Sequence, residues 1–116
     1  MVADVLTSLQ QTIKQRMQED NSTQSYVAQL NSQGINKILE KIIEETGETV
    51  LAAKDYHAQP SAQTKQEVIA ELADTLFHTL VLLGKLDIDI QDIYQELARR
   101  NGISGITEKL QRKNAT

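Results

Sequence analysis

The fold of the chain is decided by two acidic stretches, Glu44-Glu45-Thr46-Gly47-Glu48 and Glu71-Leu72-Ala73-Asp74. Both occur within apolar patterns of helical period, which predicts that both lie on helices rather than in loops. Each residue advances an α-helix by about 100°, so Glu45 and Glu48 are about 60° apart, as are the two acids of the second stretch. Like charges at this spacing repel each other. Because a bound cation would remove this repulsion, we expect a cation site.

Two long helices carry these stretches. Apolar residues spaced by three and four predict one helix over roughly residues 35–54 and another over roughly residues 62–84. The segment 55–61, which contains Pro60, is predicted to be the loop between them, and Gly84 is predicted to end the second helix. This second helix is apolar around nearly its whole circumference, which is typical of a buried helix.

Three further segments complete the predicted fold. They are an amphipathic helix over roughly residues 2–19, a short helical segment over residues 25–30 that precedes Gly34, and a fourth main helix that Asp89 caps. There is no strand-like alternation, so the sequence predicts an all-α helical bundle of four main helices. A chain of this length with so many apolar faces is expected to complete its bundle by dimerisation.

Length and composition limit the classes of function. We expect one domain over residues 1–116, with residues 1–24 as an N-terminal helix and linker and residues 101–116 as a partly ordered C-terminal tail. The net charge of −4 argues against a nucleic acid or an anionic membrane as partner. The absence of cysteine excludes disulfides, thiolate catalysis and cysteine zinc sites, and favours the cytoplasm. The first residues show no signal-peptide pattern, and no apolar run reaches the roughly 18 residues that span a bilayer.

Several acidic side chains are predicted to interrupt apolar helix faces. Measured from Ile38, Glu45 lies at about −20° and therefore within the apolar face of its helix, with Glu48 and Glu44 at the edge. The second long helix carries a polar stripe about 60° wide. Its members are Glu67, Glu71, Asp74 and His78. Opposing the two helices gathers carboxylates in a half-buried space, where ionised groups are too costly to leave unpaired. Oxygen ligands without cysteine favour Mg²⁺, or alternatively Mn²⁺, over zinc.

Each of these features also has a purely structural interpretation. An acidic stretch alone is more often a solvated helix face than a site. Lys37 and Lys41 would bind substrate phosphates as point charges, or form surface ion pairs such as Lys41 with Glu45, and the residues alone favour the surface pairs. His78 would contact substrate or a metal-bound water, although a core histidine or one that supports the ligands is commoner. Tyr26 is expected to pack rather than to stack on a base.

Three segments resemble the phosphoribosyl-ATP pyrophosphatase family. They are Ser25-Tyr26-Val27-Ala28-Gln29-Leu30, the run from Lys37 to Val50, and the run from Glu71 to Leu83. This family belongs to the all-α nucleotide pyrophosphohydrolase (MazG-like) superfamily, whose signature is Glu-Glu-x-x-Glu followed by Glu-x-x-Asp. The likeness covers about residues 25–100, and residues 104–109 also resemble the family's C-terminal end. Ile43 departs from the pattern, because the family usually has a glycine there, and its side chain would crowd a ligand that approaches this helix.

The resemblance implies Mg²⁺-dependent hydrolysis of phosphoribosyl-ATP to phosphoribosyl-AMP and pyrophosphate, the second step of histidine biosynthesis. It assigns the metal to Glu45, Glu48, Glu71 and Asp74. Glu44 is expected to order or deprotonate the attacking water, with Glu45 as the second catalytic carboxylate. Under the resemblance, Lys37 and Lys41 become phosphate-binding residues that neutralise charge on the pyrophosphate leaving group. A homodimer and a small-molecule nucleotide substrate are implied as well.

Two rival functions are compatible with the residues. A house-cleaning nucleoside triphosphate pyrophosphohydrolase of the same fold would use the same carboxylates on ordinary nucleotides. A non-catalytic helical dimerisation module would carry solvated acidic faces and would gain no stability from a metal.

Overall fold

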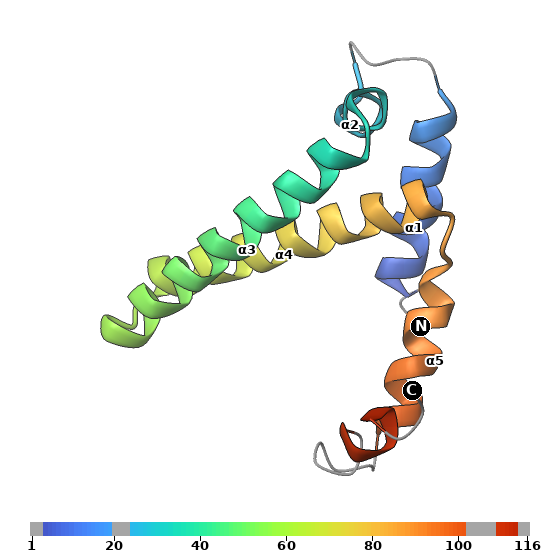
Figure 1. Cartoon of the computed structure of the whole chain (residues 1–116). Helices are drawn as coiled ribbons and strands as arrows, with labels where there is room; N and C mark the ends of the chain where they lie inside the picture. Colours follow the sequence, from blue (N-terminus) through green and yellow to red (C-terminus); the bar gives the residue numbers. More distant parts are fainter. Residues whose placement is uncertain (1–3, 20–23, 102–108, 114–116) are drawn as a thin grey trace.

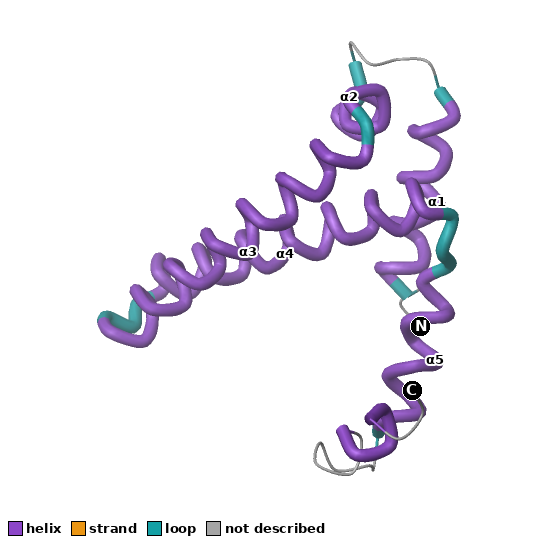
Figure 2. The backbone as a smooth tube through the Cα atoms, viewed as in Figure 1, coloured by secondary structure: helices purple, strands orange, loops and turns teal. Residues whose placement is uncertain are grey.

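The computed structural model describes residues 4–19, 24–101 and 109–113 (Figure 1, Figure 2). Its main helices are α1 (Val5–Gln18), α2 (Tyr26–Gln33), α3 (Ile35–Ala58), α4 (Ala62–Leu86) and α5 (Ile90–Arg100). A short helical turn follows at residues 109–113. No strand occurs in these described ranges, which confirms the predicted all-α class. Among the same residues, no helix is both long and apolar enough to cross a membrane.

The helices α3 and α4 form an antiparallel hairpin, and the other helices gather at one end of it (Figure 1). There α1 packs on α4, α2 contacts both α1 and α3, and α5 packs on α1. The rest of the hairpin, where α3 turns back into α4, extends away from the other helices. We call this part, residues 45–74, the arm.

The turn of the hairpin is shorter than predicted. Helix α3 continues through Ala58, so the predicted loop 55–61 is reduced to its last three residues. No residue before Ala58 breaks the helix, whereas Pro60 disfavours helical backbone at the position that precedes it. Ser61 then caps α4, because its hydroxyl accepts the backbone N–H of Thr64 while the Thr64 hydroxyl accepts the N–H of Ser61.

Gly84 does not end α4, contrary to the prediction. The helix continues to Leu86, and Asp87 adopts the left-handed conformation (φ 56°, ψ 45°) that commonly follows a helix. The glycine serves close packing instead. A Cβ atom at position 84 would lie 2.9 Å from Sδ of Met17, so the missing side chain leaves room for this residue of α1.

The remaining helix boundaries agree with the sequence within a few residues. Gly34 separates α2 from α3 and has a positive φ of 96°, which glycine adopts readily. Asp89 caps α5 by accepting the backbone N–H of Gln91, as predicted. The short predicted segment after residue 25 is α2, which lasts eight residues. The predicted linker and most of the predicted tail lie outside the described residues.

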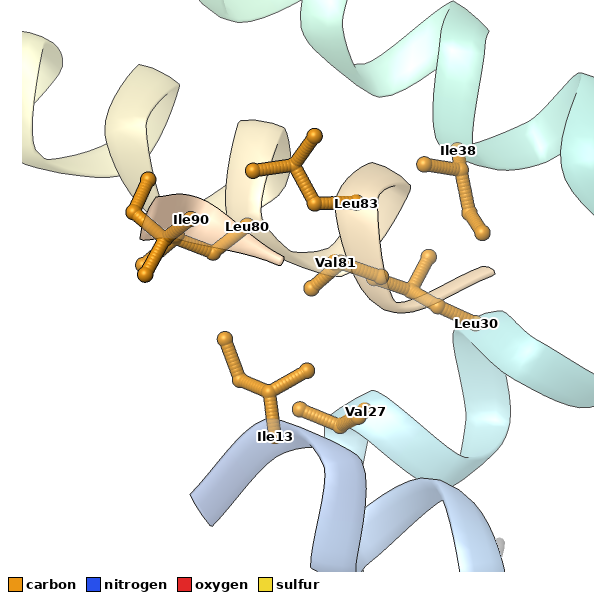
Figure 3. Packing of buried hydrophobic residues seen from close by; sticks show 8 residues of the cluster. All are labelled: Ile13, Val27, Leu30, Ile38, Leu80, Val81, Leu83 and Ile90. Carbon is orange, nitrogen blue, oxygen red and sulfur yellow. The ribbon is translucent and has the colours of Figure 1, made fainter. Parts of the chain in front are cut away.

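The core is aliphatic and lies where the five helices meet. Figure 3 shows the buried side chains of its central cluster, which are Ile13, Val27, Leu30, Ile38, Leu80, Val81, Leu83 and Ile90. The prediction that α4 is buried all round is wrong for its first half. Ile69 and Leu72 are 49% and 47% exposed, because α3 alone accompanies α4 along the arm.

Gln10 joins α1 to the start of α5. Its side chain is buried; the amide nitrogen donates to the carbonyl oxygen of Ile88 (2.8 Å), and the amide oxygen accepts the backbone N–H of Ile90 (2.9 Å). The first N–H groups of a helix have no partner within the helix. A hydrogen bond from the Tyr94 hydroxyl to Asp4 (2.6 Å) ties the same two helices together at the surface.

We expect Gln10→Met to lower the free energy of unfolding by about 2 kcal/mol, because it leaves a buried donor and a buried acceptor without partners at nearly constant volume. Urea unfolding followed by circular dichroism measures this change. Gln11→Met, on an exposed position of the same helix, is the matched control and should change stability by less than about 0.5 kcal/mol. Equal effects of the two substitutions would contradict the role of Gln10.

Candidate active site

Three carboxylates meet between α3 and α4 at the base of the arm. Glu45 comes from α3, whereas Glu71 and Asp74 come from α4, and one oxygen of each lies within 4.8 Å of the other two. Glu45 is 8% exposed, Glu71 is partly buried and Asp74 is exposed. The carboxylate cluster, as we call these three residues, therefore reaches from the interior to solvent. Glu67, the first member of the predicted stripe, is exposed and lies outside the cluster.

Two oxygen atoms of the cluster are buried without a hydrogen-bond partner among the described residues. They are Oε2 of Glu45 and Oε2 of Glu71. A buried carboxylate oxygen that accepts no hydrogen bond is costly unless a proton or a cation is near it. The cluster is thus incomplete as a set of protein groups alone.

Glu48 adds to the negative charge of the cluster. The pKa of Glu45 is raised, first by burial and then by the charge of Glu48. The pKa of Glu71 is raised to about 7, first by a hydrogen bond with Glu48 and then by desolvation. Without a cation, the folded protein therefore retains a proton here at a pH where ordinary carboxyl groups have lost theirs.

Two threonines hold α3 and α4 in register beside the cluster. Thr49, one turn after Glu45, donates to the carbonyl oxygen of Glu45 (2.9 Å), and Thr75 does the same for Glu71 (2.9 Å). The two hydroxyl oxygens lie 3.2 Å apart. Either hydroxyl can donate its single proton to the other, and the one that does so gives up its bond to the carbonyl oxygen. This pairing places the turn that carries Glu45 beside the turn that carries Glu71.

Of the predicted catalytic and phosphate-binding residues, Glu44 and Lys37 lie on the exposed side of α3, whereas Lys41 is partly buried and Glu45 is buried. The Glu44 side chain is 53% exposed, and its Oε2 lies 3.2 Å from Nζ of Lys41. Lys37 pairs with Glu40 at 3.8 Å. The expected surface ion pair of Lys41 with Glu45 is wrong, because the lysine pairs with the carboxylate three positions along the helix rather than four.

His78 is buried and connects α4 to α2. Its Nδ1 lies 2.8 Å from the backbone carbonyl oxygen of Asp74, which can only accept, so Nδ1 carries a proton. In the neutral ring Nε2 is then an acceptor, and the Tyr26 hydroxyl donates to it at 2.8 Å. His78 is thus a core residue that supports the turn of Asp74, and both of its nitrogens are engaged by the protein.

Tyr26 borders the acidic site. The pKa of its phenol is raised, first by partial burial; Lys41 opposes this rise, and Glu45, Glu44 and Asp74 add to it. The side chain is 45% exposed, so the expectation that it serves only packing is incomplete. No periodicity marks Tyr26 in the sequence, because α2 is too short for one, and its neighbours in space come from other helices.

Comparison with known proteins shows which family the chain resembles. A sequence model described as "Phosphoribosyl-ATP pyrophosphohydrolase" matches residues 6–101. A Neisseria meningitidis serogroup B protein named phosphoribosyl-ATP pyrophosphatase is 45% identical over 108 residues, which cover 93% of this chain and 94% of the relative. Proteins of the same name are 44% identical in Cupriavidus metallidurans (96% and 93% covered) and 46% identical in Geotalea daltonii (91% and 92% covered).

Without divalent cations, we expect the melting temperature to fall as the pH rises from about 5 to 8. The folded pKa of Glu71, about 7, lies above its ordinary value of 4.5, so between these values the folded state binds more protons than the unfolded state. The stabilisation by this proton is complete below pH 4.5 and is lost as the pH rises through 7. Scanning calorimetry measures the trend.

Mg²⁺ should weaken this dependence, because a cation held by the ionised carboxylates would compete with the proton. We expect Mg²⁺ to raise the melting temperature more at pH 8 than at pH 5. Glu71→Gln should reduce both the pH dependence and the effect of Mg²⁺, whereas Glu67→Gln, one turn away, should keep both. A cation effect of equal size at the two pH values would contradict this electrostatic account.

Proposed function

The chain belongs to the phosphoribosyl-ATP pyrophosphohydrolase family, and on this premise we propose that it hydrolyses phosphoribosyl-ATP to phosphoribosyl-AMP and pyrophosphate, the second step of histidine biosynthesis. The family match includes the whole arm and the carboxylate cluster. Relatives that bear the name of this activity align with nearly the full chain. The observation that carries the proposal is the pair of buried, unpartnered oxygens of Glu45 and Glu71 within the matched region.

A divalent cation fits the carboxylate cluster. All donors are carboxylate oxygens, which suit Mg²⁺ or Mn²⁺, and Glu45, Glu71 and Asp74 already converge on one another. We assign the ion to these three residues together with Glu48, whose charge acts on two of them. When bound, the ion would offset triphosphate charge and polarise a phosphoryl oxygen of the phosphorus atom that water attacks.

Glu44 is the proposed base, with Glu45 as the second catalytic carboxylate. In the reaction, the oxygen of a water molecule bonds to the α-phosphorus, and the bond from the α-phosphorus to the oxygen that bridges to the β-phosphate breaks. Glu44 accepts the proton of that water. Its exposure suits this role, because the side chain can meet both solvent and a substrate above α3.

Lys37 and Lys41 are the proposed phosphate-binding residues. Both hold exchangeable ion pairs on the helix surface, Lys41 with Glu44 and Lys37 with Glu40. Ion pairs of this kind contribute little to stability, so phosphates can replace the carboxylates as partners at small cost. When pyrophosphate charge engages Lys41, Glu44 is released from its ion pair beside the reacting water.

We also propose a homodimer in which a second copy covers the exposed apolar surface. Besides the arm residues of α4, Ile43, Val50 and Leu51 of α3 are 74%, 54% and 65% exposed. A hollow of about 190 Å³ with an apolar lining lies between α1, α4 and α5, and Leu76 and Leu97 form part of its wall. An apolar surface of this extent is typical of a protein interface.

The remaining partners and the location follow from charge and composition. The acidic chain suits a small nucleotide held through a cation and a few lysines, rather than a nucleic acid or a membrane surface. With no cysteine in its sequence, it suits the reducing cytoplasm. Both assignments are part of the proposal.

We expect pyrophosphate release from phosphoribosyl-ATP with Mg²⁺ or Mn²⁺, and none after chelation, because the carboxylates need the cation to accept a triphosphate. A coupled phosphate assay measures this beside a panel of ordinary nucleoside triphosphates. Preference for ordinary triphosphates would instead favour the house-cleaning enzyme, and silence on all substrates would favour the dimerisation module.

The same assay applied to Asp74→Asn tests whether the carboxylate cluster holds the cation. It removes ligand charge at nearly constant shape and should lower kcat by at least about 100-fold while circular dichroism stays unchanged. Glu67→Gln removes one charge from an exposed position of the same helix and should retain most of the activity. Near-normal turnover of Asp74→Asn would contradict the assignment of the cation to the carboxylate cluster.

Leu97→Glu should convert the dimer into a monomer, because the substitution places a charge in the proposed interface. It should not unfold the single chain, because Leu97 is 58% exposed there. Sedimentation velocity measures the oligomeric state. Gln95→Glu adds the same charge to an exposed polar position of α5 and should leave the dimer intact. A monomeric wild type would contradict the proposed assembly directly.

A further inference from the structure

Tyr26 is exposed in a position where its neighbours in sequence are buried. It is the first residue of α2, whose N-terminus is capped by the Ser25 hydroxyl through the backbone N–H of Ala28. Val27 and Leu30 of the same helix are 7% and 2% exposed and belong to the core, whereas the Tyr26 side chain is 45% exposed. The helix is therefore anchored by its other residues, and the open face of Tyr26 contributes little to that anchoring.

The Tyr26 ring is nevertheless held in one orientation. Its hydroxyl is hydrogen-bonded to buried His78 at 2.8 Å, and His78 is in turn bonded to the backbone of Asp74. One side of the ring lies against Phe77, with ring centroids 6.2 Å apart and planes inclined by 22°. An aromatic side chain fixed in this way loses little conformational entropy when a ligand covers its open side.

The Tyr26 ring lies near the residues that are proposed to hold the reacting phosphates. The hydrogen bonds through His78 place Tyr26 next to the turn of α4 that carries Asp74. From α3, Lys41 and Glu45 are close enough to act on the Tyr26 phenol. A ligand whose phosphates lie between Lys41 and the carboxylate cluster thus has a rigid, uncharged aromatic surface beside it.

We propose that the open face of Tyr26 binds the purine ring of the nucleotide substrate, and that ring contacts with Phe77 and His78 hold the aromatic ring for this contact. The inference rests on the proposed function, because it takes the phosphates of the same nucleotide to lie at the carboxylate cluster. In a nucleotide the base is separated from the α-phosphate by a single ribose, so a base surface must border the phosphate site. Stacking on an aromatic side chain discriminates by ring shape rather than by charge, which complements the charged groups of α3.

Tyr26→Leu should raise the KM for phosphoribosyl-ATP by about 10- to 100-fold, the usual effect of losing one stacked aromatic ring. It should change kcat by much less and leave inhibition by inorganic pyrophosphate, which uses only the cation and the lysines, unchanged. Tyr26→Phe keeps the ring face and should stay within about threefold of the wild-type KM. Tyr56→Leu, at a 37% exposed tyrosine near the far end of the arm, is the matched control.

An unchanged KM in Tyr26→Leu would overturn the inference, and so would an equal loss in Tyr26→Phe, which would assign the effect to the hydroxyl alone. Weaker inhibition by pyrophosphate in Tyr26→Leu would also overturn it, because the substitution would then have disturbed the carboxylate cluster. An inactive wild-type protein would contradict the proposed function instead, so the two failures are distinct.

A measurement on the unaltered chain covers the case in which Tyr26→Leu does not fold. The sequence has only three tyrosines, so their ring protons are separable by NMR. Adding AMP with Mg²⁺ should shift the ring resonances of Tyr26 and leave those of Tyr56 and Tyr94 in place. Unshifted Tyr26 resonances at saturating AMP would contradict the contact.

Discussion

The burial of the Glu45 carboxylate against Glu71 is the constraint on which the rest of the structure depends. Carboxylates in a partly dry space repel one another and lack donors, so two helices can hold them together only if other interactions keep those helices in place. On one side of the cluster, packing in the aliphatic core keeps the two helices in place, through Ile38 of α3 and Val81 of α4. The Thr49–Thr75 contact fixes the register on the other side.

The residues that support the carboxylate cluster form a series of contacts, which starts in the core and ends at the solvent-exposed Asp74. Val27 and Leu30 hold α2 in the core, and Tyr26 at the start of this helix bonds to His78. His78 then donates a hydrogen bond to the backbone carbonyl oxygen of Asp74, the most exposed member of the cluster. The exposed carboxylate thus stands on a turn that is attached to the interior by directional bonds, which limits its movement without removing it from water.

Helical spacing predicts the approach of carboxylates from α3 and α4, which depends on backbone geometry alone. The meeting of Glu45 with Glu71 follows from two long helices joined by a short turn. The choice of partner for Lys41 did not follow, because positions three and four residues away are both within reach of a flexible side chain. The prediction that Gly84 ends α4 is wrong for a similar reason, because a glycine that ends a helix and one that makes room for Met17 look alike in sequence. The exposed ring of Tyr26 depends on contacts between helices, which no local pattern records.

The separation of the core from the arm has a consequence for how the chain tolerates change in the cell. Substitutions among core side chains such as Leu30 alter the fraction of molecules that are folded, and hence the amount of protein that escapes proteolysis. Substitutions of exposed charged side chains such as Glu44 and Asp74 change that amount less and alter the chemistry of each molecule. The amount of folded protein and the activity per molecule therefore depend on different sets of positions. Selection on flux through the pathway can change the activity per molecule without changing the amount of folded protein.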